Sequence, residues 1–400
     1  MKSEWTYRPL GELVSFASGG TPSKKRDDYW GGTIPWISAK TLKTENIDTS
    51  DLFITEEGLK AGSKIAPKGS ILLLTRGSGL FNGIPIARVE KDVAFNQDIK
   101  CLDSYGEVEN EFIFYWLLSQ KDYLMAKVGV TGIGAGKFDL DFLQKLMIPI
   151  PSERERKSIV GFASSISEKI RCNAKVNDNL EQQAVALFKS WFVDFSLFGG
   201  TVPENWDDTT LENITTLITR GIAPKYSDNS DQTVVNQKCI RNHTIDLSLA
   251  RTHTPKAINE KWLKFGDLLI NSTGDGTLGR VAQVWFAPKA LTVDSHVTIV
   301  RPAREELIFY IGLWGILHEK EIESLHTGST GQTELPRDRV KMLKLLLPDD
   351  SSLSRFNSII APMTSTIISN QEENQKLANL RDTLLPKLMS GVIDVANVQL

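Results

Sequence analysis

Two halves of this 400-residue chain repeat the same landmarks in the same order, and this repetition limits the possible folds more than any other feature. The apolar runs that begin at Gly69 and Gly266 are 197 positions apart, and Phe114 and Phe309 are 195 positions apart. Further equivalent pairs are Leu10 and Leu211, Thr131 and Thr327, and Pro151 and Pro348. Small drifts around one offset are expected where loops of different length join equivalent elements. The sequence therefore predicts two domains of one architecture.

Each half begins with short apolar runs bounded by glycine, proline and asparagine, which is typical of strands joined by turns. The expected elements are buried strands at 71–75 and 268–271, short amphipathic helices at 111–127 and 305–325, and proline-bounded strands at 146–151 and 343–348. This mixture predicts the α/β (α+β) fold class for both halves.

A long polar segment with helical periodicity closes each half. Its apolar residues recur at alternating spacings of four and three, which is the seam pattern of a coiled coil. The seam residues are Ile159, Ala163, Ile166, Ile170, Asn173, Asn177, Leu180, Ala184 and Leu187 in the first segment and Phe356, Ile360, Met363, Ile367, Asn370, Asn374, Leu377 and Leu384 in the second. Each helix could instead pack only on its own domain, but the duplicated length and the matched asparagines favour pairing of the two helices.

Two asparagines interrupt each seam at equivalent places. An asparagine in a seam weakens packing but can fix the register and the partner. The second segment must return along the first, so we expect an antiparallel pair with an internal pseudo-two-fold axis. The midpoints of the two seams predict that Asn173 lies near Asn370. Pro362 is expected to kink the second helix or to mark a delayed start, and Arg381 to weaken the far end of the seam.

These patterns predict an alternation of globular and helical parts along the chain. The expected domains are 1–151 and 199–348, and the expected spacer helices are 152–198 and 349–400. A helix of about 44 residues spans roughly 66 Å at 1.5 Å per residue. The expected arrangement is two globular domains separated by a long antiparallel two-helix coiled coil.

Composition excludes several classes of protein. The net charge is −3, so any DNA contact must come from local basic patches rather than from the total charge. No apolar run reaches the length of about 18 residues that a membrane span needs, so we expect no membrane partner. The three cysteines, Cys101, Cys172 and Cys239, lie far apart, which argues against a disulfide framework and suits a cytoplasmic protein.

The sequence shows little sign of catalysis. The glycine-rich run 132–137 lacks the flanking residues of a nucleotide-binding phosphate loop. The five histidines have no partners at metal-ligand spacing, and residues 294–296 resemble a nucleophile cluster only in composition. We find neither a methyltransferase signature nor a paired-carboxylate nuclease centre. We therefore expect no catalytic residue and no metal site.

Basic and amide side chains at predicted strand ends and loops are candidates for DNA contacts. Arginine and lysine neutralise phosphates or bind guanine, and asparagine and glutamine suit adenine. The candidates are Lys24, Lys25, Arg26, Lys40, Lys43, Arg76, Asn82, Arg88, Gln97 and Lys137 in the first half and Arg220, Lys225, Asn236, Gln237, Lys238, Arg241, Asn271, Arg280 and Arg337 in the second.

Several motifs together resemble the specificity subunits of type I restriction–modification systems. They are Gly-Gly-Thr-Pro-Ser at 19–23, Tyr-Trp-Gly-Gly-Thr-Ile-Pro-Trp-Ile-Ser at 29–38, Asn-Gln-Asp-Ile at 96–99, and the segments 187–195 and 380–391 near the ends of the two long helices. The resemblance covers essentially the whole chain. The second half departs from it, because Arg-Gly-Ile-Ala-Pro stands at 220–224 and no Tyr-Trp-Gly-Gly follows.

The resemblance implies a function. The two globular domains would be target-recognition domains that each read half of a split double-stranded DNA target. The helices would set the spacer and dock two methyltransferase subunits, and motor-nuclease subunits would join the complex. S-adenosylmethionine, ATP and Mg²⁺ would be bound by those partners, with no cofactor in this chain, which would itself be non-catalytic.

The difference between the halves adds one inference from physical reasoning. Identical halves related by a two-fold axis read a palindrome, whereas these halves differ in their loops. We therefore expect an asymmetric target of two unlike half-sites. The alternatives are a coiled-coil assembly scaffold, or a single-chain DNA methyltransferase or nuclease with degenerate motifs.

Overall fold

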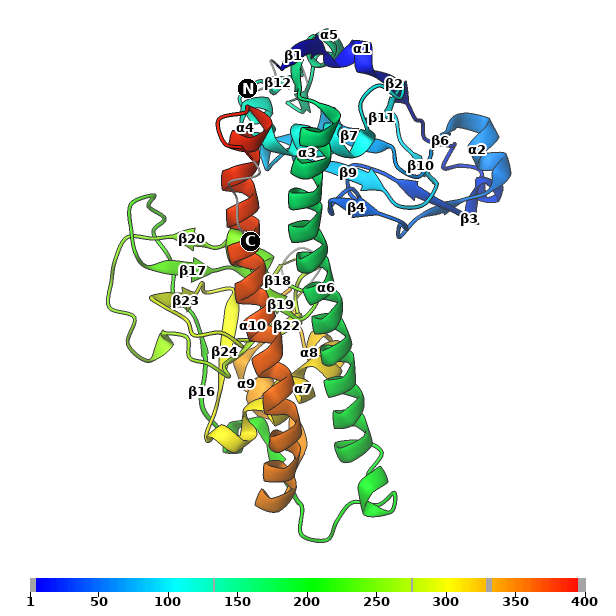
Figure 1. Cartoon of the computed structure of the whole chain (residues 1–400). Coiled ribbons are helices and arrows are strands. Elements are labelled where there is room, and N and C mark those ends of the chain that lie inside the picture. Colours follow the sequence, from blue (N-terminus) through cyan, green and yellow to red (C-terminus); the bar gives the residue numbers. More distant parts are fainter. Residues whose placement is uncertain (1–4, 132–133, 275, 329–332, 395–400) are drawn as a thin grey trace. The chain divides into compact units, whose positions relative to one another are not determined.

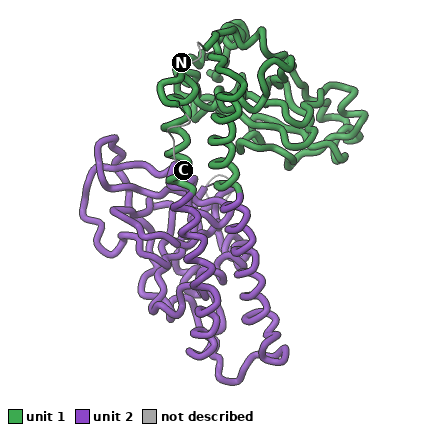
Figure 2. The backbone as a smooth tube through the Cα atoms, in the orientation of Figure 1, with its two compact units in different colours: residues 1–171, 374–400 green, residues 172–373 purple. Residues whose placement is uncertain are grey.

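The structure is a computed structural model that describes residues 5–131, 134–274, 276–328 and 333–394. The chain forms two compact units, shown in Figure 2. Unit 1 contains residues 1–171 and 374–400, and unit 2 contains residues 172–373. The long helices α6 (Glu153–Phe192) and α10 (Asp350–Met389), labelled in Figure 1, each contribute one segment to each unit, as the colours of Figure 2 show.

The globular part of unit 1 is built on a five-stranded sheet in the order β2-β11-β7-β9-β4. Its strands are β2 (Val14–Ser18), β11 (Ile99–Ser104), β7 (Ile71–Leu74), β9 (Ile86–Val89) and β4 (Asn46–Ile47). The smaller sheets contain β5 (Phe53–Ile54), β3 (Trp30–Ile37), β10 (Val93–Phe95) and β6 (Lys64–Ala66); β12 (Gly129–Val130), β13 (Gly136–Lys137) and β8 (Arg76–Gly77); and β1 (Thr6–Pro9) with β14 (Met147–Ile150). The helices are α1 (Leu10–Leu13), α2 (Glu56–Gly62), α3 (Asn110–Ser119), α4 (Lys121–Met125) and α5 (Leu140–Gln144).

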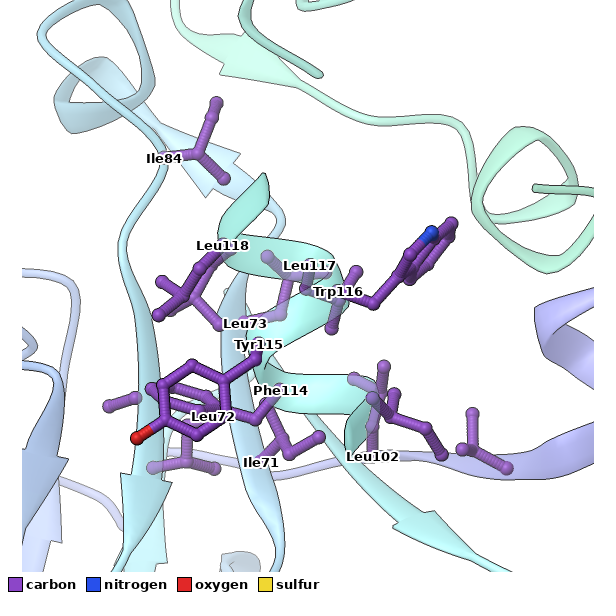
Figure 3. Close-up of a cluster of buried hydrophobic side chains, with 14 of the residues drawn as sticks. Ile71, Leu72, Leu73, Ile84, Leu102, Phe114, Tyr115, Trp116, Leu117 and Leu118 are labelled. Atoms are coloured by element: carbon purple, nitrogen blue, oxygen red, sulfur yellow. The ribbon is translucent and has the colours of Figure 1, made fainter. Parts of the chain in front are cut away.

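The core of unit 1 lies where α3 packs on this sheet. All four residues of β7 are buried, as are seven consecutive residues of α3 from Phe112 to Leu118. Figure 3 shows side chains of β7 and α3 gathered in this cluster. A strand buried on both faces is expected for the continuous apolar run Ile71–Leu74, because such a run leaves no polar face for solvent.

Unit 2 repeats this architecture. Its main sheet has the order β16-β24-β21-β22, which corresponds to β2-β11-β7-β9 of unit 1. These strands are β16 (Thr215–Arg220), β24 (Val297–Pro302), β21 (Leu268–Asn271) and β22 (Val281–Gln283). The smaller sheets contain β20 (Arg251–Thr252), β17 (Thr233–Val235) and β23 (Leu291–Val293); β18 (Ile240–Arg241) with β19 (Thr244–Ile245); and β15 (Asp207–Thr210) with β25 (Lys344–Leu347). The helices are α7 (Ile308–Leu317), α8 (Glu319–Ser324) and α9 (Arg337–Lys341).

The matching strand orders confirm the predicted duplication and the mixed fold class. The predicted strands at 71–75, 146–151, 268–271 and 343–348 are present as β7, β14, β21 and β25. The two predicted short helices are each interrupted. The first breaks at Gln120, between α3 and α4, and the second breaks at His318, between α7 and α8.

The long helices pack against each other within each unit. In unit 1, Ile159 and Ile166 of α6 share a core with Leu388 of α10. In unit 2, Phe188 of α6 shares a core with Phe356 of α10, and their ring centroids are 6.0 Å apart. Every residue of the predicted seam is buried or half-buried.

The register of the pair differs from the prediction. Within unit 2, Asn370 Nδ2 donates a hydrogen bond to Asn177 Oδ1 at 2.8 Å, and Asn173 Nδ2 donates to Glu373 Oε2 at 2.7 Å. The partner numbers rise on one helix as they fall on the other, so the segments are antiparallel. Asn370 thus bonds Asn177 and not the predicted Asn173. The observed partner of Asn370 on α6 lies about one helical turn beyond the partner that the midpoints of the two seams predicted.

Two further expectations concerned α10, namely that Pro362 kinks the helix or marks a delayed start and that Arg381 weakens the far end of the seam. The helix begins at Asp350, so Pro362 lies inside it and does not mark a delayed start. Arg381 has polar partners at its seam position. It is buried, its Nη1 donates to Glu45 Oε2 at 2.6 Å, and it also donates to Ser167 Oγ at 3.2 Å. The charge on this seam position is therefore compensated inside unit 1.

Among the described residues, no helix has the length and apolar character that a membrane crossing needs.

Candidate nucleic-acid interface

The glycine pair at 19–20 allows two close backbone contacts in unit 1. A Cβ atom on Gly19 would overlap the carbonyl oxygen of Phe95, and one on Gly20 would overlap that of Gly62. Gly20 N–H also donates to Phe95 O at 2.9 Å. Only glycine fits at such positions. The motif therefore places Thr21 beside the turn that follows β10.

That turn is formed by Asn96, Gln97 and Asp98. Asp98 N–H donates to Asn96 Oδ1 at 3.2 Å, which is a local turn typical of asparagine. The carbonyl oxygen of Asp98 accepts from the N–H of Thr75 at 2.8 Å. Gln97, at the tip of the turn, is exposed and accepts a hydrogen bond from Thr21 Oγ1 at 2.7 Å. The turn thus joins the Gly-Gly-Thr-Pro segment to the end of β7.

The strand pair β8–β13 brings two cations together at the same place. Arg76 of β8 lies directly opposite Lys137 of β13 in an antiparallel register. Both side chains are exposed. Lys137 ends the glycine-rich run 132–137, whose residues 132–133 lie outside the described part of the chain. The end of the run forms the strand β13, whereas a phosphate loop leads directly into a helix.

These residues line an open cavity of about 270 Å³, which we call the basic pocket. Its walls include Arg76, Gln97, Lys100, Lys137, Phe138 and Asp139. Lys100 comes from β11 and donates a hydrogen bond to Ser18 Oγ. Asp139 Oδ1 accepts from the N–H of Asp141 at the start of α5. Three cations from three strands therefore face one cavity.

The equivalent place in unit 2 has different chemistry. Thr273 and Glu334 pair across an antiparallel bridge, where unit 1 pairs Arg76 with Lys137. Arg220 ends β16, and its Nη1 lies 2.6 Å from Glu334 Oε1. Arg220 Nη2 also donates to Leu335 O at 2.9 Å. The cation in unit 2 is therefore neutralised by a carboxylate.

The turn after β23 also differs in composition from its counterpart after β10. His296 N–H donates to Asp294 Oδ1 at 2.9 Å, and His296 Nδ1 lies 2.7 Å from Thr273 Oγ1. Burial raises the pKa of Asp294. Gly221 makes the same close approach as Gly19, because its Cβ would overlap the carbonyl oxygen of Val293. The two units therefore share a backbone frame and differ in the side chains they present.

Comparisons with known proteins show which proteins this chain is similar to. The family profile of the type I restriction modification DNA specificity domain matches residues 2–182. The chain is 27% identical to the specificity subunit of the type I restriction enzyme MjaIX of Methanocaldococcus jannaschii, over 98% of this chain and 94% of that subunit. The chain is similar to the specificity subunits of type I restriction–modification systems over nearly its whole length.

Other relatives agree with this assignment. The specificity subunit of the type I restriction enzyme EcoR124I/EcoR124II of Escherichia coli is 31% identical over 40% of each chain. The crystal structure of a type I restriction–modification S subunit from M. genitalium superposes with a TM-score of 0.56 at 17% identity, covering 96% of both chains. The chain therefore shares the fold of that S subunit over nearly its whole length.

The other candidates of unit 1 fall into two groups. Lys24, Lys25, Arg26, Lys40, Lys43 and Asn82 are exposed. Arg26 also forms an ion pair with Asp28 at 2.6 Å. Arg88 is different, because its guanidinium is half-buried, pairs with Glu90 at 2.8 Å and also pairs with Glu111. The expectation that Arg88 contacts DNA is not supported, since its charge is already compensated within the sheet and α3.

The candidate residues of unit 2 also differ in their exposure to solvent. Lys225, Lys238, Arg241 and Arg337 are exposed, and Asn236, Gln237 and Arg280 are half-buried. Arg280 Nη2 donates to Gly276 O at 2.6 Å. Asn271 is fully buried and its Nδ2 donates to Gln237 O at 3.0 Å, so it cannot reach a DNA groove directly. The prediction for Asn271 is therefore wrong, because the residue ends a strand inside the core.

Sequence reasoning missed Lys100 as a member of the basic pocket. Lys100 lies in β11 between Ile99 and Cys101, which are both buried. A lysine between buried neighbours points to the opposite face of a strand, and this alternation is the signal that could have found it. Its association with Arg76 and Lys137 depends on the pairing of strands and is not visible in the sequence.

Proposed function

We propose that each unit of this specificity subunit reads one half of a bipartite, asymmetric double-stranded DNA target. The observation that supports this most strongly is the repeated frame with unlike side chains. The turn after β10 carries Asn96, Gln97 and Asp98, and the equivalent turn after β23 carries Asp294, Ser295 and His296. Base readout depends on which side chains reach the groove, so unlike side chains on one frame select unlike half-sites.

We also propose that the long helices set the unread gap between the half-sites and dock two methyltransferase subunits. α6 and α10 each have 40 residues, which corresponds to about 60 Å of helix at 1.5 Å per residue. The methyltransferase subunits would bind S-adenosylmethionine, and motor-nuclease subunits would bring ATP and Mg²⁺. This chain would take no part in the chemistry, in keeping with relatives that are named as specificity subunits.

A map of methylated adenines tests the proposal. The chain is expressed with its partner methyltransferase in cells that lack other adenine methylation, and the partner alone is the control. We expect one asymmetric motif in two parts with an unread gap, and no such motif with the partner alone. A continuous or palindromic motif, or the same motif without this chain, would contradict the proposal.

A further inference from the structure

The basic pocket contains two like charges that lie directly opposite each other on paired strands. Arg76 and Lys137 are direct cross-strand neighbours, and like charges in that relation destabilise a sheet. The ion pairs of unit 1 that the described residues form involve other cations, such as Arg8, Arg26, Arg88 and Lys121. Among the described residues, Arg76, Lys100 and Lys137 form no ion pair, so the pocket keeps a net positive charge even with the carboxylate of Asp139 in its wall.

A third cation and the shape of the pocket strengthen this reasoning. Lys100 is half-buried, and Lys100 and Gln97 line the same cavity as Arg76 and Lys137. Asp139, the acidic residue of the wall, is occupied as the cap of α5 through its bond with Asp141 N–H. A concave site with three converging cations and an amide fits a compact anion with several acceptor oxygens.

We infer that the basic pocket binds a backbone phosphate of the DNA target. This inference rests on the proposed function and names a contact within it. An arginine can bind two phosphate oxygens through parallel N–H groups, and a lysine ammonium acts as a point charge beside them. Phosphate contacts fix where a protein lies on a duplex and do not select bases. Arg76, Lys100 and Lys137 are therefore positioning residues for unit 1.

Unit 2 lacks this phosphate site at the equivalent place. Glu334 stands where unit 1 has Lys137, and it forms an ion pair with Arg220. A carboxylate at that position repels a phosphate, and the paired arginine is half-buried. The two recognition units should thus contribute unequally to the salt dependence of binding, with unit 1 contributing more.

The test compares two double variants of the full chain in complex with the partner methyltransferase. R76Q/K137Q removes two charges from the pocket. K68Q/K91Q removes two exposed charges at the other end of the sheet, since Lys68 lies before β7 and Arg76 lies after it. Binding to a target duplex and to a non-target duplex is measured by fluorescence anisotropy between about 50 and 200 mM salt. Thermal unfolding of both variants verifies that they are folded, and the single variant Lys137→Gln replaces the double variant if it is not.

We expect R76Q/K137Q to weaken both duplexes by the same factor, on the order of 10-fold at low salt, and to make the slope of log K against log salt shallower by about 1. The methylation motif should be unchanged. Binding that matches K68Q/K91Q in affinity and slope would overturn the inference. Loss of preference at one base pair would also overturn it, because the pocket would then read a base. If the wild-type complex shows no sequence preference, the proposed function fails, while the salt slope still reports on the phosphate.

The reverse change in unit 2 provides an independent arm. Glu334→Gln removes the carboxylate that neutralises Arg220. We expect tighter binding to both duplexes and a slope steeper by up to about 1, because the released guanidinium can neutralise a phosphate. Glu321→Gln, an exposed change on α8, is the matched control. Binding that is weaker than that of the control, or the same, would contradict the assigned difference between the units.

Discussion

Replacing Asp267 with alanine is expected to destabilise unit 2 by about 3–5 kcal/mol. Asp267 is fully buried, and its two oxygens accept from Arg301 Nε and Nη2, each at 2.7 Å. Arg301 also donates to Glu260 O at 2.9 Å and to Trp262 O at 2.7 Å. The pair thus fastens the segment before β21 to β24. Without Asp267 the guanidinium stays in a largely buried site with no opposite charge, which is the costly outcome for a buried ion pair.

The measurement is denaturant unfolding, with hydrogen exchange of β21 and β24 used to assign the loss to unit 2. Glu212→Ala is the matched control. Its ion pair with Lys341 has a half-exposed carboxylate with 51% of its side-chain surface accessible, and such a pair is worth less than about 1 kcal/mol. A cost for Asp267→Ala no larger than the cost of this control would show that the buried pair does not hold the segment.

Glu45→Ala is expected to destabilise unit 1 by about 2–4 kcal/mol and to release the end of α10. Glu45 accepts from Arg381 Nη1 at 2.6 Å and from Arg381 Nη2 at 3.1 Å, and Lys121 Nζ adds a bond at 3.2 Å. Burial acts to lower the pKa of Arg381, but the charge of Glu45 and the hydrogen bonds of Asp382 and Glu45 hold it above the ordinary value. Arg381 therefore remains charged, and in the variant its remaining carboxylate partner would be the exposed Asp382, whose Oδ1 lies 2.9 Å from Arg381 Nε.

The second half of this test uses the equivalent seam position of unit 2. Ala184, which lies 197 positions before Arg381, is buried and apolar. The double variant E45A/R381L should therefore recover most of the loss, because an apolar side chain needs no partner there. Protease cleavage and hydrogen exchange within 374–389 report the release of α10. Equal instability of the single and double variants would show that the charge pair is not the cause.

Periodicity predicted the architecture of the chain well, because helices and strands each repeat their apolar residues at a fixed spacing. The register of the helix pair was missed because the apolar stripe was treated as one interface. Its outer residues, such as Ile159 and Phe356, also belong to the cores of the globular parts. The polar contacts Asn177–Asn370 and Asn173–Glu373 form one turn away from the predicted pairing.

The site could be predicted only as separate residues. Arg76, Gln97 and Lys137 were candidates from charge and loop position, but their convergence depends on strand pairing between distant segments. Arg88 and Asn271 looked similar in sequence. The charge of Arg88 is compensated by Glu111 on α3, and Asn271 is buried inside unit 2. No local sequence pattern reveals either fact.

The central claim is that two unlike units on one frame each select one half-site. A chain that contains two copies of unit 2 and no unit 1 tests this claim most directly. In each copy, residues 199–369 are joined to residues 173–198, and the two copies follow each other in one chain. Residue 173 can follow residue 369 because positions 173 and 370 are equivalent at the 197-residue offset. Each copy therefore keeps the segments of α6 and α10 that belong to unit 2. The measurement is the map of methylated adenines with the partner methyltransferase. We predict an interrupted palindrome built from one half-site of the parental target, because identical halves read identical half-sites. A folded tandem chain that still methylates an asymmetric target would contradict the claim.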